Sequence, residues 1–272
     1  MNRILFHEME AYFRGKYPEL SLDPYSRAFC SQEGTELAHT FAQSYADYGQ
    51  YLCLRARIYY EHVTTLLKSN SYDAVISLGT GFSLLTFYLS EYHSNIRFID
   101  ADDAILMKTR KNRMVPVQKL FGPQTLQVEQ KIFDLEKVAK AKGEIQNFFP
   151  YKNPLFLMEG LSLFLNKKNL SWLFQSLQDY AKFTFIYDCF SQGSPALQKV
   201  RELMNQLSTA KNNDLFFAEG FDGNQIEAME GKSLKIKEHS FLDLEKKYLQ
   251  DSSFFQDRID SFQIHFRVIL KN

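Results

Sequence analysis

The sequence predicts an α/β fold built on a doubly wound, mostly parallel sheet with helices on both faces. From residue 73 onward, short apolar segments alternate with segments of helical spacing, as in right-handed β-α-β units. A turn of small residues, Gly79-Thr80-Gly81, follows the first apolar segment, and a carboxylate follows most of the others. At 272 residues, the chain can hold one large domain or one domain with an appendage.

The N-terminal part of the chain is predicted to be mostly helical. From Thr35 to Lys68, apolar residues recur at roughly helical spacing, and Gly49 is the only glycine or proline in that stretch. Asp23-Pro24 lies before it and favours a turn between two helices. Residues 1–67 therefore differ in pattern from residues 68–272, where the strands are expected.

Five apolar segments read as buried strands, with helical segments between them. The strands are predicted at 73–78, 96–100, within 127–135, at 155–158 and at 183–188. The intervening helices are predicted at 82–90, 104–113 and 168–182. Near the C-terminus, strand-like segments at 233–238 and 262–270 flank a helix at 241–249, so a closing antiparallel strand is expected there.

The residues that follow each strand are the candidates for ligand binding, because ligands of open α/β sheets lie beyond the carboxyl ends of the strands. Gly79 and Gly81 allow a close approach, since no side chain occupies the ligand's space. Asp100 follows them by roughly 20 residues, the separation at which an acidic residue binds a ribose diol. The third glycine of a dinucleotide-binding fingerprint is missing, since Gly81 is followed by Phe82, Ser83 and Leu84. This favours a nucleoside ligand without phosphates, and S-adenosylmethionine (SAM) is the commonest of these.

Four segments of the chain together resemble a known family. They are DAVISLGTG, FIDADDAILMK, IFDL and PLFLMEGLSLFL. They resemble the leucine carboxyl methyltransferase group, which includes bacterial polyketide O-methyltransferases, and the resemblance runs from roughly Asp23 to Asp188. It implies a Rossmann-like, seven-stranded SAM-binding sheet with an antiparallel strand near the C-terminus. It also implies an N-terminal helical lid, residues 1–67, over a methyltransferase core, residues 68–272.

The resemblance also implies which residues would hold the nucleoside half of SAM. Asp100 would bind the ribose, and Asp134 and Leu135 would contact the adenine. The family usually continues the glycine turn with an Asp-Thr-Arg-like segment, whereas Ser83 and Leu84 stand there in this chain. That departure leaves the substrate less defined than the cofactor.

The amino-acid half of SAM would lie against Gly79, near Glu159, according to the same resemblance. Arg57 matches the family arginine that clamps the methionine carboxylate, a task that suits a bidentate guanidinium. Arg55 lies two residues away and remains an alternative. A basic residue from the N-terminal region is expected as well, either Arg14 or Lys16.

The resemblance implies a SAM-dependent O-methyltransferase. The expected acceptor is a carboxylate of a small, polyketide-like molecule or of a protein C-terminus, because a carboxylate is already ionised at neutral pH. A hydroxyl acceptor would require a base, and His39, His62 and Tyr60 are the candidates. Two alternatives remain: a protein that binds SAM or a partner without turnover, and an NAD(P)-dependent oxidoreductase. The missing third glycine argues against the latter.

Composition limits the partners and the compartment. The 32 basic and 32 acidic residues balance, so the overall charge favours neither nucleic acid nor an anionic membrane as a partner. Three scattered cysteines and six histidines show no metal-binding spacing, so no metal is expected. The N-terminus lacks the pattern of a signal peptide, and no apolar stretch is long enough to span a bilayer. We therefore expect a cytoplasmic protein.

Overall fold

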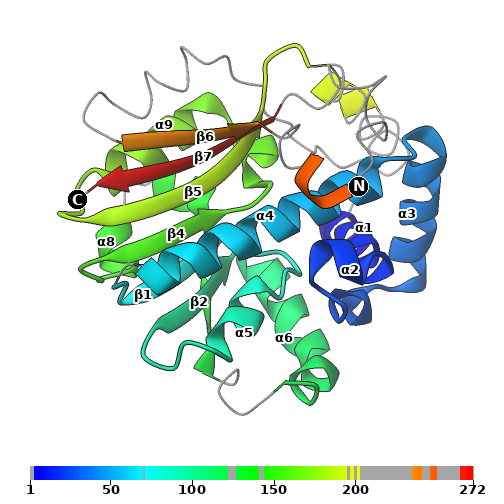
Figure 1. Cartoon of the computed structure of the whole chain (residues 1–272), viewed down its shortest axis with the longest axis horizontal. Coiled ribbons are helices and arrows are strands. Elements are labelled where there is room, and N and C mark those ends of the chain that lie inside the picture. Colours follow the sequence, from blue (N-terminus) through cyan, green and yellow to red (C-terminus); the bar gives the residue numbers. More distant parts are fainter. Residues whose placement is uncertain are drawn as a thin grey trace.

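The computed structural model describes residues 3–69, 71–121, 127–140, 144–194, 197–198, 201–202, 235–240, 246–249 and 264–271. Its strands form a seven-stranded sheet in the order β3-β2-β1-β4-β5-β7-β6 (Figure 1). The strands are β1 (Ala74–Leu78), β2 (Arg97–Asp102), β3 (Glu129–Ile132), β4 (Pro154–Met158), β5 (Phe183–Phe190), β6 (Lys235–Ser240) and β7 (Ile264–Lys271). The first five pair in parallel, and β7 pairs antiparallel with both β5 and β6. The predicted fold class is therefore confirmed.

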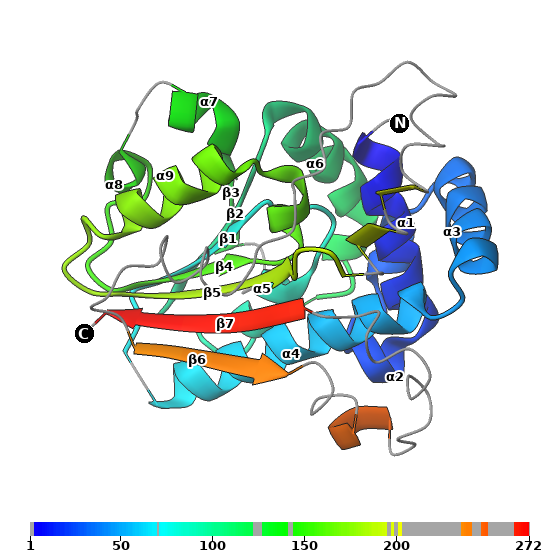
Figure 2. The same cartoon turned by 90° about the horizontal axis from the view of Figure 1, so that it is seen from above.

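Helices cover both faces of this sheet, and Figure 2 shows α4 and α9 on opposite sides of it. The longer helices are α1 (Arg3–Lys16), α3 (Gln32–Ser44), α4 (Tyr48–Ser69), α6 (Ala104–Gln118) and α9 (Lys167–Leu177). The shorter ones are α2 (Pro18–Ser21), η1 (Ser26–Phe29), α5 (Leu85–Ser90), α7 (Leu135–Lys140), α8 (Ile145–Phe148) and η3 (Leu161–Phe164). Every residue of β1 is buried, as expected for a central parallel strand. Its side chains alternate between two apolar clusters: Val75 belongs to one and Ile76 to the other.

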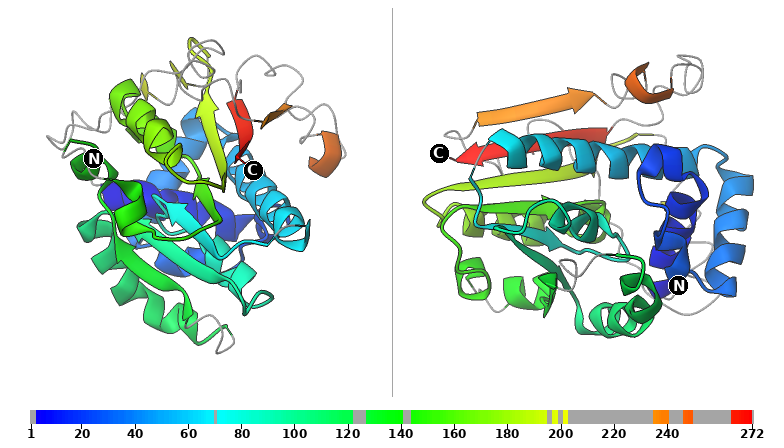
Figure 3. Two further views of the ribbon diagram at one scale, coloured as in Figure 1. Left: turned by 90° about the vertical axis from the view of Figure 1, so that its left-hand side faces the viewer. Right: turned by 60° about the horizontal axis from the view of Figure 1, so that its bottom comes forward.

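The N-terminal helices gather at the end of the sheet where the parallel strands have their carboxyl ends (Figure 3). Helix α1 buries Phe6, Met9 and Phe13, which are spaced along one helical face. The stretch from Thr35 to Lys68, where apolar residues recur at helical spacing, forms two helices, α3 and α4, separated by residues 45–47. Helix α4 packs on α1 and α2 and also contributes to the cluster beneath β1, so it joins the N-terminal helices to the sheet.

The end of one strand differs from the sequence prediction in a way that affects the site. Strand β2 continues two residues past Asp100, to Asp102, and Asp103 then caps α6 by accepting the backbone N–H groups of Ile105 and Leu106. The C-terminal helix expected at 241–249 lies outside the described residues except for 246–249, which are helical. No helix in the described ranges has the length and apolar character needed to cross a membrane.

Candidate functional site

The switch in strand order lies at β1, which pairs with β2 on one side and β4 on the other. Gly79 and Gly81 follow β1 with φ of +66° and +54°, in the left-handed region that favours glycine. A Cβ on Gly79 would lie 2.7 Å from a methyl carbon of Leu161, and one on Gly81 would lie 2.8 Å from Nδ1 of His7. Both glycines are therefore required by the conformation and by the close packing above the turn.

Two adjoining cavities lie beside this turn. The first, named here the arginine cavity, is lined by His7, Glu10, Arg14, Ser77, Gly79, Thr80, Gly81, Phe82, Ser83, Glu159, Gly160, Leu161 and Phe164. The second, named the aspartate cavity, is lined by Leu78, Gly79, Asp102, Asp103, Phe133, Asp134, Leu135, Glu136, Leu161, Phe164 and Leu165. Gly79, Leu161 and Phe164 line both. The two cavities therefore lie side by side and share these three residues as a wall.

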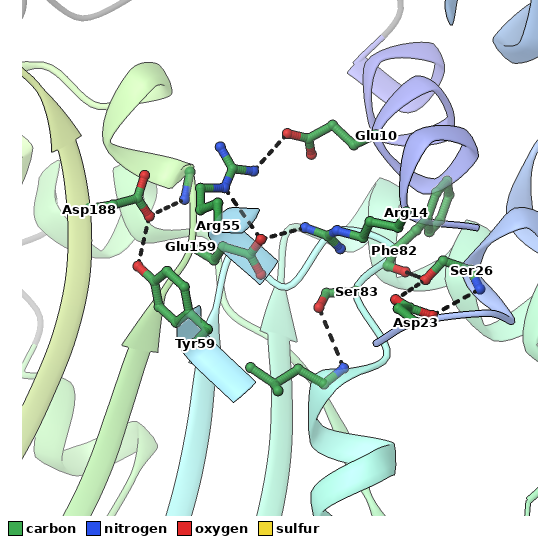
Figure 4. A network of polar contacts seen from close by, with 12 residues as sticks. Glu10, Arg14, Asp23, Ser26, Arg55, Tyr59, Phe82, Ser83, Glu159 and Asp188 are labelled. Atoms are coloured by element: carbon green, nitrogen blue, oxygen red, sulfur yellow. Dashed lines mark hydrogen bonds and ion pairs between the residues drawn. The ribbon is translucent and has the colours of Figure 1, made fainter. Parts of the chain in front are cut away.

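Figure 4 shows a cluster of buried charges, of which Glu10, Arg14 and Glu159 line the arginine cavity. Oε1 of Glu159 accepts hydrogen bonds from Nη2 of Arg14 at 2.7 Å and from Nε of Arg55 at 3.3 Å. Nη2 of Arg55 donates to Oε1 of Glu10 at 2.9 Å. Within the described part of the chain, Nε of Arg14 has no hydrogen-bond partner although it is buried. An unpaired guanidinium N–H beside a cavity is a donor suited to a ligand carboxylate.

The two arginines considered from sequence occupy different environments. Arg57 is partly exposed: Nε donates to Oε1 of Glu61 at 3.0 Å, Nη1 donates to the carbonyl of Glu19, and the guanidinium lies over the ring of Tyr248. It lines neither cavity, whereas Arg55 is buried beside Glu159. Arg55 lies on the inward face of α4. Arg57 is two residues further along the helix and therefore points away from that face.

Arg14 is the N-terminal basic residue that lines the arginine cavity. The Nζ of the alternative, Lys16, lies instead over the rings of Tyr12 and Tyr17, 5.9 and 5.2 Å from their centroids. Arg14 projects toward the cavity because it shares a helical stripe with His7 and Glu10, at spacings of three and seven residues.

Asp100 does not line either cavity. Its carboxylate is fully buried, pairs with Nη2 of Arg110 at 2.6 Å, and accepts the hydroxyls of Thr80 and Thr86. Arg110 also donates to the carbonyls of Gly81 and Ser83. Asp100 thus stabilises the glycine turn through Thr80 and Arg110. It lies two residues before the end of its strand.

Asp102 stands at the end of β2 and lines the aspartate cavity. Its Oδ2 accepts the backbone N–H of Gly81 at 2.9 Å, and its Oδ1 accepts that of Asp103 at 2.8 Å. Burial raises the pKa of this carboxyl above its usual value, although both backbone bonds favour the ionised form. Sequence reasoning missed Asp102; Asp103 as the cap of the next helix was the signal that the strand ends there.

The other residues predicted for the site line one or both of the two cavities. Asp134 and Leu135 line the aspartate cavity, and Gly79 and Glu159 line the arginine cavity. Asp134 accepts the backbone N–H of Lys137 at 3.1 Å and pairs with its ammonium, so it stands at the exposed rim. Leu135 is buried and begins α7.

A buried pair supports the strand end that carries Glu159. Tyr59 donates to Oδ1 of Asp188 at 2.7 Å, and the backbone N–H of Gly160 donates to the same oxygen at 2.8 Å. Burial raises the pKa of Asp188. Gly160 has φ of +69°, and a Cβ there would lie 2.8 Å from Nη2 of Arg55. Asp188 therefore positions the turn that brings Glu159 to Arg55.

The bases considered from sequence lie outside the cavities. His39 hydrogen-bonds Tyr12 at 2.8 Å, His62 packs on the ring of Phe266, and Tyr60 is half-buried on α4. The histidine that lines the arginine cavity is His7, which sequence reasoning did not select.

Glu10 is expected to make the stability depend on pH. Burial acts to raise the pKa of its carboxyl, but Arg55, together with His7 and Arg14, lowers it from 4.5 to about 2. Because this pKa is lower in the folded than in the unfolded chain, the ionised carboxylate stabilises the fold fully above pH 4.5 and progressively less as the pH falls toward 2.

Glu10→Gln should therefore lower the free energy of unfolding by roughly 3 kcal/mol at neutral pH. The difference from the wild type should shrink as the pH falls below 4.5, the ordinary pKa of a glutamate. Urea unfolding of both proteins between about pH 7 and about pH 3.5 measures it. A difference that stays constant over this range would contradict the assignment.

Comparisons with known proteins agree with this architecture. Neither a family model nor a curated protein sequence matches the chain. A candidate methyltransferase from Thermobifida fusca YX is similar in structure, with a TM-score of 0.62 at 12% identity over 96% of this chain and 94% of that one. A DUF574 family protein from Streptomyces avermitilis gives a TM-score of 0.58 at 9% identity, covering 89% and 92% of the two chains.

The third similar structure is the plantazolicin methyltransferase BamL, crystallised with a triazolic desmethylPZN analog and S-adenosylhomocysteine (SAH). Its TM-score is 0.50 at 12% identity, and both chains are covered completely. Similarity at such low identity establishes a shared fold. The chain therefore has the same fold as these structures, two of which are named methyltransferases.

Proposed function

We propose that the chain is a SAM-dependent O-methyltransferase. The observation that carries the proposal is that the two cavities share Gly79, Leu161 and Phe164, with Arg14 lining the first cavity and Asp134 the second. Two adjoining cavities of this kind suit an elongated ligand that has a charged amino-acid group at one end and a nucleoside at the other. The fold that the chain shares with methyltransferases agrees with such a ligand.

The residues present fit the two halves of SAM. The carboxylate of Asp102 would accept the ribose hydroxyls, and Asp134 with the backbone of Leu135 would bind the adenine. Arg14, whose buried Nε lacks a partner in the described residues, would bind the methionine carboxylate. Glu159 would accept the ammonium group, and Arg55 would hold Glu159 in place.

The protein's contribution to the reaction is orientation and the exclusion of water. SAM, when bound, supplies an activated methyl group on a sulfonium. The N-terminal helices, residues 1–67, would act as a lid over the core of residues 68–272. Arg57 lies on the outer surface of this lid and has no part in the proposed site.

The two other functions remain distinguishable. An NAD(P)-dependent oxidoreductase would need room for a pyrophosphate against the helix that follows the glycine turn, where Phe82 is buried instead. A protein that binds SAM without turnover would share the site but transfer no methyl group.

Calorimetry and thermal unfolding test the proposal. SAM or SAH at a hundredfold excess over its Kd should raise the melting temperature by about 5–10 °C, whereas NAD should not change it. Transfer of a tritiated methyl group from SAM to a metabolite extract then separates an enzyme from a binding protein. Absence of both heat and thermal shift with SAH, for folded protein freed of ligand, would contradict the proposal.

A further inference from the structure

His7 occupies a position in the arginine cavity that the proposed cofactor contacts leave unexplained. Its side chain is 18% exposed, and its Nδ1 lies 3.7 Å from Oε2 of Glu10, one helical turn further on. The ring packs edge-on against Phe82, with centroids 6.2 Å apart, and lies 6.4 Å from the ring of Phe164. It stands directly over Gly81, where an added Cβ would lie 2.8 Å from Nδ1.

His7 lies beside the junction of the two cavities. Phe164 lines both of them, and His7 contacts its ring from the arginine cavity. His7 also lies close to Asp102 in the aspartate cavity, near enough for the imidazole, once protonated, to act to lower the pKa of that carboxyl. A ligand that reaches from Asp134 to Arg14 must pass this junction. In SAM the sulfonium joins the nucleoside to the amino-acid half, so the reactive methyl group would lie here.

Glu10 places a carboxylate oxygen 3.7 Å from Nδ1 of the imidazole. The pKa of Glu10 is lowered to about 2, so its carboxylate is ionised at physiological pH. A carboxylate beside Nδ1 favours the tautomer that carries the proton on Nδ1 and leaves the lone pair on Nε2. Across the described ranges, no side chain or backbone group hydrogen-bonds Nε2 of His7. Nε2 is therefore available to accept a proton.

We propose that His7 is the general base that deprotonates a hydroxyl acceptor, a phenol or an alcohol, and that Glu10 is its positioning residue. This inference rests on the proposed function and narrows its substrate class, because a carboxylate acceptor needs no base. As the acceptor oxygen bonds to the methyl carbon, Nε2 takes the hydroxyl proton. The carbon–sulfur bond breaks, its electron pair stays on sulfur, and the products are a methyl ether and SAH. The imidazolium then releases its proton to water.

A complex that cannot turn over tests the base directly. The probe is 4-nitrophenol, whose phenolate absorbs visible light, added to the protein saturated with SAH at about pH 6, where the free phenol is mostly neutral. A base at the site should convert bound probe to phenolate in the wild type, and His7→Gln should reduce that absorbance at least about tenfold. His93→Gln, at the opposite end of the sheet, is the matched control and should behave as wild type. No phenolate signal in the wild type, or an equal signal in His7→Gln, would overturn the assignment.

Turnover with two phenols of different acidity gives an independent readout. At about pH 8, 4-nitrophenol is largely ionised, whereas 4-methoxyphenol is not. His7→Gln should therefore lower kcat for 4-methoxyphenol on the order of 10²-fold, but lower it for 4-nitrophenol less than about threefold. Equal losses for the two phenols, or methylation of benzoate with none of either phenol, would overturn the proposal.

Measuring SAM binding distinguishes a failure of the proposed function from a failure of the role assigned to His7. Calorimetry should give His7→Gln a Kd for SAM within about threefold of the wild type, because a base acts on the acceptor rather than on the cofactor. If the wild type binds no SAM, the proposed function itself fails. If SAM binds and the phenol experiments fail, only the assignment of His7 and of the hydroxyl acceptor falls.

Discussion

Arg110→Met should lower the free energy of unfolding by roughly 3–5 kcal/mol, the cost of removing one partner from a buried ion pair. Arg110 and Asp100 are both fully buried, and the pair joins α6 to β2. Methionine keeps much of the side-chain volume but leaves the Asp100 carboxylate without a counter-charge. The carbonyls of Gly81 and Ser83 also lose their guanidinium donors. The loss is a large part of a typical domain's stability, and urea unfolding measures it.

A second variant identifies the cause of this loss. Combining Arg110→Met with Asp100→Asn removes the unpaired charge and should recover part of the stability. Lys111→Ala, an exposed neighbour on the same helix, should change the free energy of unfolding by less than about 0.5 kcal/mol. A loss below about 1 kcal/mol for Arg110→Met would show that the pair does not stabilise the turn as described.

Asp102→Asn should weaken the binding of SAH by roughly 10- to 100-fold, the effect of losing one charged hydrogen-bond acceptor. Asparagine is nearly the same size and can still accept the backbone N–H of Gly81, so the glycine turn should keep its shape, but its amide nitrogen cannot accept the backbone N–H of Asp103. Urea unfolding of the variant measures the cost of that lost bond separately from the loss of the ribose contact. Titration calorimetry of the folded variant gives the affinity.

Asp100→Asn is the matched comparison, two residues away on the same face of the same strand. Because Asp100 faces Arg110 and lines neither cavity, this change should lower stability while leaving the Kd for SAH within about threefold of the wild type. The opposite result, with affinity lost in Asp100→Asn and kept in Asp102→Asn, would return the ribose-binding role to Asp100.

The class of fold could be predicted from sequence because it depends on local patterns. Apolar runs such as residues 73–78 and 155–158 are bounded by glycines or carboxylates, and their alternation with helical segments allows few arrangements besides a parallel sheet. The convergence of Gly79, Asp134 and Glu159 follows from the same pattern, since parallel strands have their carboxyl ends at one edge. No knowledge of side-chain packing was needed for these positions.

The side chains that complete the site depended on tertiary structure. The position at which β2 ends decided between Asp100 and Asp102, because side chains on one face of a strand repeat every two residues. Asp100 contacts Thr86 of α5 and Arg110 of α6, whereas Asp102, at the end of the strand, lines the aspartate cavity. The rotation of α4 decided between Arg55 and Arg57, which differ by about 200° around the helix axis. The last residue of β2 and the orientation of α4 about its axis cannot be obtained from the sequence, because the boundaries of strands and helices are predicted only to within a few residues.

Local sequence patterns were therefore sufficient to predict the sheet, the glycine turn after β1 and the strand ends that surround the candidate site. These features follow from periodicity and from residues with special backbone freedom. The placement of His7, Glu10 and Arg14 beside this turn depends instead on tertiary packing. They come from a helix far away in sequence, and the angle at which α1 docks is set by the packing of its buried face, Phe6, Met9 and Phe13, against the rest of the core.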